Sequence, residues 1–338
     1  MNIIEINQNN LIHNFEFFKK RTKAKICAMV KANGYGHDAK TVAQILCNKV
    51  DYFGVNNLSE AIEIREVTNK PILVVGVCEE RFDDAVKYGV DLTVYNVESL
   101  QAMLSTNLPI RVHIAVNTGM NRLGFRPEEV KSVVDKINQS NLLLIGVFTH
   151  FATADSDKKY FDYQVKQFKN ALNSIDTSGL IIHASNTSAL KYPSIHYDMV
   201  RLGIGLYGYG QKGLRPVMRV KSKVVALHQI EKNESVGYGR GYVANEPCEV
   251  AVIPLGYADG INRHLARKIF VKINSKPCFV VSNICMDMFM VKVPKGTKIG
   301  DEVIIMDNAD IWANELKTIN YEVLTAFNHK RFDINVTN

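Results

Sequence analysis

The stretch that decides the fold is KICAMVKANGYGH, residues 25–37, where an apolar run ends on a lysine and opens into a turn. Removing an ammonium group from water costs several kcal/mol unless its charge is paired or lost. Lys31 is therefore either a solvated side chain at a strand end or a chemical group. Burial would lower its pKa, and a neutral amine is what a Schiff-base nucleophile requires. Gly34 and Gly36 suit a tight turn in which backbone can approach a ligand.

Short apolar runs recur along the first 215 residues, and amphipathic stretches separate them. Runs without strict alternation are typical of strands that are covered on both faces. Eight such runs are strand candidates, at residues 25–31, 50–55, 71–77, 90–95, 110–116, 142–150, 179–184 and 200–206. Helical patterns lie between them, at residues 37–49, 58–67, 79–88, 97–104, 127–137 and 158–173. Eight βα units predict a (β/α)8 barrel of the TIM type, and a doubly wound open sheet is the alternative.

The rhythm changes after residue 215. Apolar runs then come close together, with glycine- or proline-bearing turns and little helical pattern between them, at residues 220–227, 249–255, 269–273, 279–281, 289–293 and 302–306. Such spacing predicts a mainly-β second domain. We expect a barrel domain over residues 1–215, a β-rich domain over 216–338 and a linker within 208–217. A strand at residues 3–6 is free to pair with either domain, and residues 1–8 are candidates for the β-rich one.

Composition and charge exclude several classes of protein. The chain is 46% hydrophobic and 22% charged, which is ordinary for a soluble globular protein. Its net charge of +7 (41 basic minus 34 acidic residues) is not gathered in an arm or patch, so we expect no nucleic-acid partner. The six cysteines form neither a CxxC pair nor a zinc-like cluster, so we expect no metal site and a reducing compartment. Without a signal-like start or a long apolar segment, we expect a cytoplasmic protein that does not enter the membrane.

Polar side chains stand at the ends of several barrel strands, where barrel enzymes place their chemistry. They are Lys31, Tyr35, Arg122, His150, Asn186, Thr187 and Arg201. Most have a purely structural alternative: Lys31 can reach solvent along its stem, His150 can be a hydrogen-bonded core residue, and Arg122 can be a surface charge. Asn186 and Thr187 can cap the next helix. Arg201 is harder to explain in this way, because a guanidinium among apolar neighbours needs buried acceptors.

Three motifs stand out in the β-rich part. Tyr238 is flanked by glycines in VGYG, residues 236–239, and Tyr257 lies in GYADG, residues 256–260. Met286 and Asp287 follow a strand in ICMD, residues 284–287. From the residues alone, each can be a simple surface turn or cap.

In the barrel part, the glycines at positions 203 and 205 would let a ligand approach the backbone, but glycine-rich segments alone are weak indications of a phosphate site.

The segment AMVKANGYGH, residues 28–37, resembles the pyridoxal-phosphate attachment signature of alanine racemases. The remaining motifs of that family follow in the same order and cover the chain from about residue 3 to about 325. They are NTGMNRLG (117–124), THFATAD (149–155), HASNT (183–187), MVRLGI (199–204), VGYG (236–239), PLGYADG (254–260) and CMD (285–287). The resemblance implies a pyridoxal-5'-phosphate enzyme with a barrel and a β domain. It also implies a homodimer in which each active site is completed by the partner's β domain.

The resemblance also implies a role for each matching residue. Lys31 would hold the cofactor covalently and move the Cα proton on one face, while Tyr238 of the other chain serves the opposite face. Arg201 would face the pyridine nitrogen, and His150 would support the ring. Arg122 would contact the cofactor's phenolic oxygen or the substrate carboxylate. The phosphate would be held by Tyr35, Asn186, Thr187, Gly203 and Ile204. Tyr257, Met286 and Asp287 would shape a narrow opening and seat the carboxylate.

The chain departs from the family pattern at three positions. Many members have a carbamylated lysine two residues before the Asp-Thr-Gly-Met turn, where this chain has Ala115 and begins the turn with Asn117. Arg122 then lacks its usual negative partner, and we expect an anion such as chloride to replace it. Thr187 stands where a serine is common and keeps the hydroxyl. His329 aligns with a tyrosine that often reaches the phosphate.

The sequence therefore predicts an isomerase that interconverts L- and D-alanine with two bases, Lys31 and Tyr238, and supplies D-alanine for peptidoglycan. A broader amino-acid racemase, for example one that accepts serine, is the alternative on the same scaffold. A related decarboxylase would usually have a glutamate in place of Arg201. A cofactor-binding barrel without enzymatic activity would lack Tyr238 and the β domain.

Overall fold

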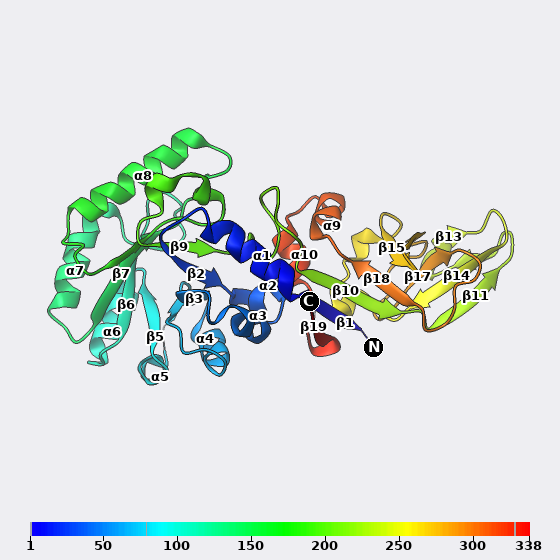
Figure 1. The fold of residues 1–338 in the computed structure, drawn as a ribbon, viewed down its shortest axis with the longest axis horizontal. Coiled ribbons are helices and arrows are strands. Elements are labelled where there is room, and N and C mark those ends of the chain that lie inside the picture. The colour runs from blue at the N-terminus through cyan, green and yellow to red at the C-terminus, as the bar shows by residue number, and fades with distance from the viewer. Residues whose placement is uncertain (1, 79, 328) are drawn as a thin grey trace. The chain divides into compact units, whose positions relative to one another are not determined.

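The barrel is the first of two compact parts. The computed structural model describes residues 2–78, 80–327 and 329–338. Eight parallel strands close into a barrel, because β9 pairs with β2, and Figure 1 shows helices on their outer side. The strands are β2 (Lys25–Met29), β3 (Tyr52–Val55), β4 (Ile72–Val74), β5 (Val90–Val94), β6 (Arg111–Val116), β7 (Leu143–Thr149), β8 (Ile181–His183) and β9 (Met199–Leu202). The predicted barrel is confirmed, and the open sheet is excluded.

Three helices of the barrel, α4 (Leu58–Arg65), α6 (Val97–Ser105) and α8 (Lys158–Asn173), begin at polar side chains that cap their first turn. Asn57, Asn96 and Asp157 each accept a hydrogen bond from a backbone N–H of the following helix. The helices are α3 (Ala39–Leu46), α4 (Leu58–Arg65), α5 (Phe82–Lys87), α6 (Val97–Ser105), α7 (Val130–Asn138) and α8 (Lys158–Asn173), with 3-10 turns η1 (Pro127–Glu129), η2 (Ser188–Lys191) and η3 (Pro193–Ile195). Each predicted helical pattern overlaps one of them. The prediction over 79–88 begins on residue 79, which lies outside the described residues.

Several strand boundaries in the barrel differ from the predictions, and a helix ahead of the barrel strands was missed. The strand expected at 25–31 ends at Met29, and Lys31 begins α2 (Lys31–Gly36). The strand expected at 200–206 ends at Leu202, since a turn begins at Gly203. The sequence analysis also missed α1 (Gln8–Lys19), although its buried residues Leu11, Phe15 and Phe18 have the spacing of a helix face.

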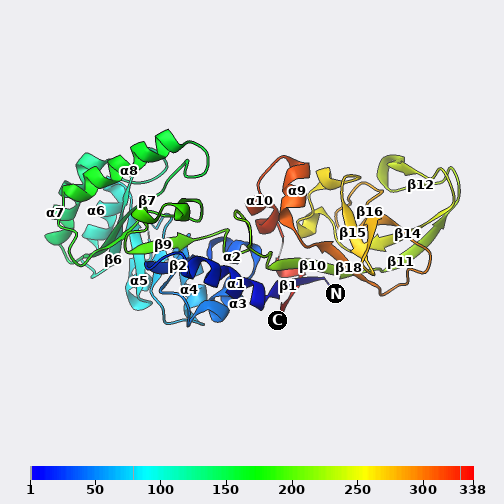
Figure 2. The ribbon, with the colours of Figure 1, turned by 45° about the horizontal axis from the view of Figure 1, so that its top comes forward.

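The rest of the chain builds mainly β structure, drawn mostly in yellow-green to orange in Figure 2, with β1 (Ile3–Asn7) in blue and β10 in green. A six-stranded sheet has the order β16-β15-β18-β10-β1-β19, in which β1 pairs antiparallel with β10 and parallel with β19. A second sheet has the order β11-β14-β17, and β12 pairs with β13. The strands are β10 (Met218–Lys223), β11 (Ala226–Ile230), β12 (Ser235–Val236), β13 (Tyr242–Val243), β14 (Cys248–Ile253), β15 (Phe270–Ile273), β16 (Lys276–Phe279), β17 (Phe289–Val293), β18 (Glu302–Met306) and β19 (Asp333–Thr337).

The predicted mainly-β domain is confirmed, but two helices that follow its last predicted strand were not predicted. They are α9 (Ala309–Leu316) and α10 (Asn320–Thr325). Asn308 caps α9 through a hydrogen bond from the Asp310 N–H, and Trp312 and Ala313 are buried on its inner face. Short helices of this kind show too few periods for the pattern to be recognised. The 3-10 turns are η4 (Tyr238–Arg240), η5 (Tyr257–Asp259), η6 (Arg263–Leu265) and η7 (His329–Arg331).

The chain divides into two compact units. The barrel unit contains Ile12–Gly34 and Ala39–Leu214. The β-rich unit contains the chain up to Leu11, Tyr35–Asp38 and Arg215–Asn338. No helix among the described residues is long and apolar enough to span a membrane.

Candidate active site

Lys31 lies at the start of a left-handed helical turn. The residues that follow it have positive φ: Ala32 51°, Asn33 50°, Gly34 64°, Tyr35 53° and Gly36 79°. The Gly34 N–H donates to the Val30 carbonyl at 2.7 Å, which closes the turn. Left-handed helix costs about 1–2 kcal/mol per residue other than glycine, so this is a strained backbone of the kind that gathers at functional sites.

Glu60 holds this turn against the barrel. Its two carboxylate oxygens accept hydrogen bonds from the Ala32 N–H at 2.8 Å and the Asn56 N–H at 2.7 Å. Tyr207 donates from its hydroxyl to the Met29 carbonyl at 2.8 Å, just before Lys31. The backbone on both sides of Lys31 is therefore fixed by side chains from other parts of the barrel unit.

The Lys31 side chain borders a cavity of about 260 Å³ at the carboxyl ends of the strands. Ala115, Arg122, Phe148 and His150 also line it. Burial lowers the pKa of the Lys31 ammonium, Arg122 lowers it further, and Glu60 acts in the opposite direction. No carboxylate is among the described residues that line the cavity, so it favours an anion and a neutral lysine.

His150 is the second titratable group at the cavity. Burial lowers its pKa to about 3, and the charges of Arg201, Arg122 and Lys31 act in the same direction. Its Nδ1 lies 3.4 Å from Arg201 Nη2, and its carbonyl accepts a 3.4 Å hydrogen bond from Gln164. At neutral pH the imidazole is therefore uncharged, and it offers the flat face of a neutral ring to a ligand.

Arg201 is buried on β9, with 4% of its surface exposed. Its Nη1 contacts His183 Nδ1 at 2.8 Å, and its Nη2 donates to the carbonyls of Thr149 at 2.7 Å and Ala184 at 3.1 Å. Burial lowers its pKa to about 10, so the guanidinium remains charged at neutral pH. Its Nε–H donates to none of the residues that the structure describes, which leaves one direction open for a ligand.

The segment after β9 offers donors for a phosphate. Thr187 Oγ1 accepts the Gly203 N–H at 3.2 Å and the Gly205 N–H at 3.5 Å, so its own proton is free to be donated. The Ile204 N–H is buried and has no acceptor among the described residues. Asn186 uses its side-chain oxygen to accept the Ala189 N–H at 3.0 Å, so the capping alternative holds for Asn186. It does not hold for Thr187, whose side chain forms no cap on η2.

Arg122 is exposed and forms no hydrogen bond or ion pair with any residue in the described ranges. Nearby, Ala115 packs in a small apolar cluster with Tyr95 and Phe148, and Leu123 covers it. At the position where many family members have a carbamylated lysine, this chain thus has only the methyl group of Ala115, in apolar surroundings.

The candidates from the β-rich unit lie on adjoining loops. Tyr238 is 72% exposed, and its carbonyl accepts a 3.0 Å hydrogen bond from the Asn283 side chain. The Tyr257 N–H donates to the Cys285 carbonyl at 3.0 Å, one residue before Met286. Tyr257 and Met286 are both exposed, so this surface offers two tyrosines and a methionine to a partner molecule.

Arg331 joins two acidic residues next to these loops, and the sequence analysis did not single it out. Its Nε lies 3.0 Å from Asp259 Oδ1, and its Nη2 donates to Asp287 at 2.7 Å. Asp287 is therefore neutralised within its own chain. Burial raises the pKa of the Asp259 carboxyl, although the Gly256 N–H and Arg331 both oppose this change.

Tyr35 and His329 belong to the β-rich unit. Tyr35 is buried, and its ring centroid lies 5.9 Å from that of Tyr321. His329 Nε2 contacts the Gly36 carbonyl at 2.9 Å, at the end of the left-handed turn. This contact with Gly36 lies within the β-rich unit.

Four further polar residues of the barrel were missed: Asp91, Arg111, His113 and His183. All four join one hydrogen-bonded network that reaches Arg201. Arg111 and His113 share with Ala115 one face of β6, so alternation along this strand was the available signal. Within the described residues, no group of three His, Cys, Asp or Glu side chains could hold a metal ion.

Two family models match most of the chain. The model described as the N-terminal domain of alanine racemase matches residues 6–211, and that of the C-terminal domain matches residues 217–334. The alanine racemase of Fusobacterium nucleatum is 37% identical over 92% of this chain and 92% of its own length. That of Staphylococcus saprophyticus is 35% identical over 95% of this chain and 91% of its own.

Solved structures give the same result. The alanine racemase of Clostridium difficile superposes with a TM-score of 0.93 at 36% identity, covering 99% of this chain and 95% of that one. The alanine racemase of E. faecalis also reaches 0.93, at 32% identity and with 99% and 97% covered.

Proposed function

The chain belongs to the alanine racemase family and is an isomerase, and we propose that it racemises alanine with Lys31 and with Tyr238 from a second copy of the chain. In this proposal residues 1–215 form the domain that binds the cofactor, except that strand β1 pairs within the sheet of the β-rich unit. Residues 216–338 form the domain that completes the site of the partner in a homodimer. The observation that carries the proposal is a lysine with a lowered pKa on a strained turn, at a cavity where Arg122 supplies positive charge and none of the described lining residues supplies a carboxylate.

The residues around the cavity fit pyridoxal 5'-phosphate. Lys31 supplies the amine for covalent attachment, and the Thr187 hydroxyl and the Ile204 N–H can donate to a phosphate. We also assign Gly203 to this phosphate site, where its N–H holds Thr187 Oγ1 in place. We include Asn186 and Tyr35 in this phosphate site. The unsatisfied donors at Arg201 Nε and the Ile204 N–H are what such a ligand would use. When bound, this cofactor supplies an electron sink that makes the Cα proton of an amino acid acidic.

Lys31 and Tyr238 divide the proton transfers between them. A racemase needs an acid or base on each side of a planar carbon, so the two groups must come from opposite walls. The lowered pKa of Lys31 increases the fraction of neutral amine that can accept a proton. Tyr238 is 72% exposed in its own chain, which supports its use by a second copy.

Arg201 and His150 would set the electronic environment of the ring. Arg201 can only donate hydrogen bonds and remains charged, so it would face an unprotonated pyridine nitrogen. His150 is neutral, so it would support the ring without adding charge. The permanent charge of Arg201 beside an unprotonated pyridine nitrogen would limit the delocalisation of negative charge into the cofactor ring. It would thereby disfavour side reactions such as transamination.

Arg122 would bind the substrate carboxylate or the phenolic oxygen of the cofactor. We propose that chloride or a similar anion lies beside it, since Ala115 cannot supply a carbamate and Arg122 has no partner among the described residues. Anomalous scattering from a crystal grown with bromide would show a peak beside Arg122, whereas a water-like site without anomalous signal would refute this. Tyr257, Met286 and Asp287 of the second copy would narrow the opening.

The reaction product suits a cell-wall role, and we propose that the enzyme supplies D-alanine for peptidoglycan in the cytoplasm. Six cysteines without disulfides are consistent with a reducing compartment. A broader racemase that also accepts serine is the second candidate, because a wider opening would change specificity without changing the residues named above.

Incubation with L-alanine in deuterated water tests the proposal. We expect bound cofactor with visible absorbance, deuterium at Cα and formation of D-alanine. Cofactor-loaded protein that produces neither deuterated alanine nor D-alanine would overturn the proposal. A parallel incubation with L-serine separates the two candidates by their ratio of kcat/KM.

A further inference from the structure

We propose that Asp91, His113 and His183 are positioning residues that hold Arg201 through a chain of hydrogen bonds. In this chain each histidine is restricted to one neutral tautomer. We call these four side chains the Asp91–Arg201 chain. They come from β5, β6, β8 and β9 of the barrel. The proposal rests on the proposed function only in its last step, the orientation of Arg201 toward the cofactor.

The four side chains follow one another at hydrogen-bond distances. Arg201 Nη1 lies 2.8 Å from His183 Nδ1, and His183 Nε2 lies 3.0 Å from His113 Nδ1. His113 Nε2 lies 3.3 Å from Asp91 Oδ2. Asp91, His113 and His183 are fully buried, so water cannot replace these contacts.

The arginine fixes the direction of the protons from one end. Its guanidinium only donates, so His183 Nδ1 must accept. His183 then has its proton on Nε2 and donates it to His113 Nδ1. For the same reason His113 has its proton on Nε2. A second proton on either ring would place two N–H groups face to face at 2.8 Å or 3.0 Å.

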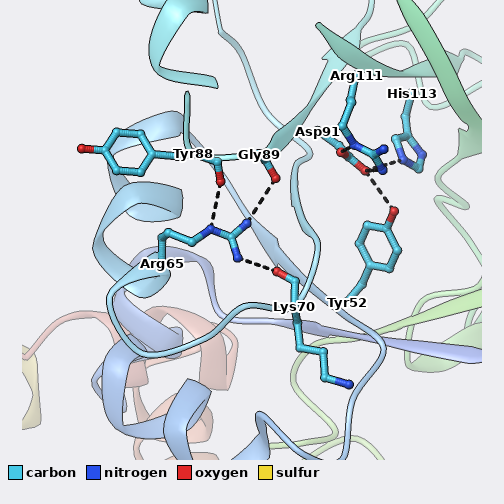
Figure 3. Close-up of polar contacts among 8 residues, drawn as sticks. All are labelled: Tyr52, Arg65, Lys70, Tyr88, Gly89, Asp91, Arg111 and His113. Carbon is cyan, nitrogen blue, oxygen red and sulfur yellow. Dashed lines mark hydrogen bonds and ion pairs between the residues drawn. The ribbon is translucent and has the colours of Figure 1, made fainter. Parts of the chain in front are cut away.

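The carboxylate fixes the same direction from the other end. Burial disfavours the ionised Asp91 carboxyl, but hydrogen bonds from His113 and Arg111, together with the neighbouring positive charge, outweigh burial and lower its pKa. Arg111 Nε donates to Oδ1 at 2.5 Å, and the Tyr52 hydroxyl donates to Oδ2 at 3.0 Å, as Figure 3 shows. An ionised carboxylate only accepts, so His113 Nε2 must donate. Both ends therefore demand the same pair of neutral tautomers.

The packing of the barrel leaves room for this chain. His113 on β6 reaches His183 on β8 across the strand between them, β7. A Cβ at Gly146 of β7 would lie 2.6 Å from His113 Nδ1, so only glycine leaves space for the ring. The Phe148 ring stacks on His183 at 4.9 Å between centroids, and the Arg201 guanidinium lies 5.3 Å from the Phe148 centroid. Phe148 also lines the cavity next to Lys31.

The consequence concerns the orientation of Arg201. Bonds to His183, Thr149 and Ala184 fix the guanidinium plane at both of its terminal nitrogens. Because the guanidinium plane is fixed, the direction of the Nε–H bond is fixed as well, and Nε is the donor that has no partner among the described residues. A flipped tautomer at His183 would oppose an N–H to an N–H and turn the guanidinium away. Asp91 thus acts on Arg201 through two rings, without touching it.

Nitrogen NMR of the cofactor-loaded protein tests the proton positions. Among the nine histidines, ring-15N labelling separates protonated from unprotonated nitrogens, and single His→Gln variants assign the signals. We expect neutral His113 and His183, each with its proton on Nε2. A cationic ring, or a proton on His183 Nδ1, would overturn the proposal.

Substitutions test the transmission along the chain. Asp91→Asn should move the ring signals of both His113 and His183, and lower kcat about tenfold with KM changed less than about twofold, because a buried donor loses its acceptor. The ring signals of His196 are the control and should not move. His196 is also buried, but it contacts Thr22 and the Leu190 carbonyl and lies outside the Asp91–Arg201 chain. A folded Asp91→Asn protein with unchanged His183 signals would refute the proposal.

If Asp91→Asn does not fold, two variants of His113 test the same proposal. His113→Gln retains one acceptor and one donor, whereas His113→Leu retains neither. We expect Gln to preserve most of the wild-type kcat and Leu to lose about tenfold. Equal losses in both variants would refute the proposal. If the wild type does not racemise alanine at all, the proposed function fails, while the NMR result still decides the proton positions.

Discussion

Gly146 lies opposite His113 in the β6–β7 ladder, and a methyl group on it would meet the imidazole. A Cβ there would lie 2.4 Å from the Ile181 carbonyl oxygen and 2.6 Å from His113 Nδ1. The glycine therefore makes space for a buried polar ring inside the barrel. This relationship connects the backbone of one strand to the side chains that fix Arg201.

Gly146→Ala should destabilise the protein by about 1–3 kcal/mol, because overpacking forces the backbone or the ring to move. The free energy of unfolding in urea measures the loss. In a His113→Ala background the ring is absent, so the same substitution should cost less, although the contact with the Ile181 carbonyl remains. Equal costs in the two backgrounds would show that the ring does not set the space.

Stability should depend on pH through His150. Folded His150 stays neutral down to about pH 3, whereas in the unfolded chain it binds a proton near its ordinary pKa of 6.5. The unfolded state then binds more protons between these values, so the free energy of unfolding falls as the pH drops below 6.5.

The variant His150→Gln removes this contribution. Between pH 6.5 and 5 the wild type should lose stability relative to the variant, with a slope that approaches about 1.4 kcal/mol per pH unit. Urea unfolding at several pH values measures both proteins. Parallel curves would contradict the lowered pKa of His150.

Tyr238→Phe should lose at least about a hundredfold in kcat while it keeps bound cofactor, because one of two proton-transfer groups is removed. The visible absorbance and the rate of D-alanine formation measure the two properties separately. Tyr242→Phe is a matched control, since Tyr242 is on the same segment and its hydroxyl contacts Cys248. Similar losses in both variants would indicate damage to the segment rather than chemistry.

Arg331→Gln should destabilise the β-rich unit by about 1–3 kcal/mol at pH 7, because it leaves the buried Asp259 carboxylate without its cation. Protonation of Asp259 would remove the unpaired charge, so the deficit should shrink as the pH falls toward 4. Thermal and urea unfolding at pH 7 and pH 4 test this. A deficit that grows in acid would argue against this ion pair.

The barrel could be predicted because its strands are short apolar runs at regular intervals, and Lys31 could be predicted because it stands at the end of one of them. The left-handed turn after Lys31 could not, since Ala32 and Tyr35 disfavour positive φ, and only the surrounding contacts impose it. Glu60 provides one of those contacts from 28 residues away.

The hydrogen bonds of the Asp91–Arg201 chain could not be predicted from the sequence either. Asp91, His113 and His183 lie far apart along the chain, and each alone is more often a core residue with local partners. Only the closure of the barrel brings them into contact across β7. The helices α9 and α10 were missed for a simpler reason, because their apolar faces span barely two turns.

The central claim is that each site joins Lys31 of one chain to Tyr238 of another, and mixing two inactive variants tests it directly. Lys31→Ala and Tyr238→Phe chains, unfolded and refolded together, should form mixed dimers with one intact site. Random pairing predicts recovery of about one quarter of the wild-type activity, since half of the dimers are mixed and each has one working site of two. Activity no higher than that of the separate variants would contradict the claim.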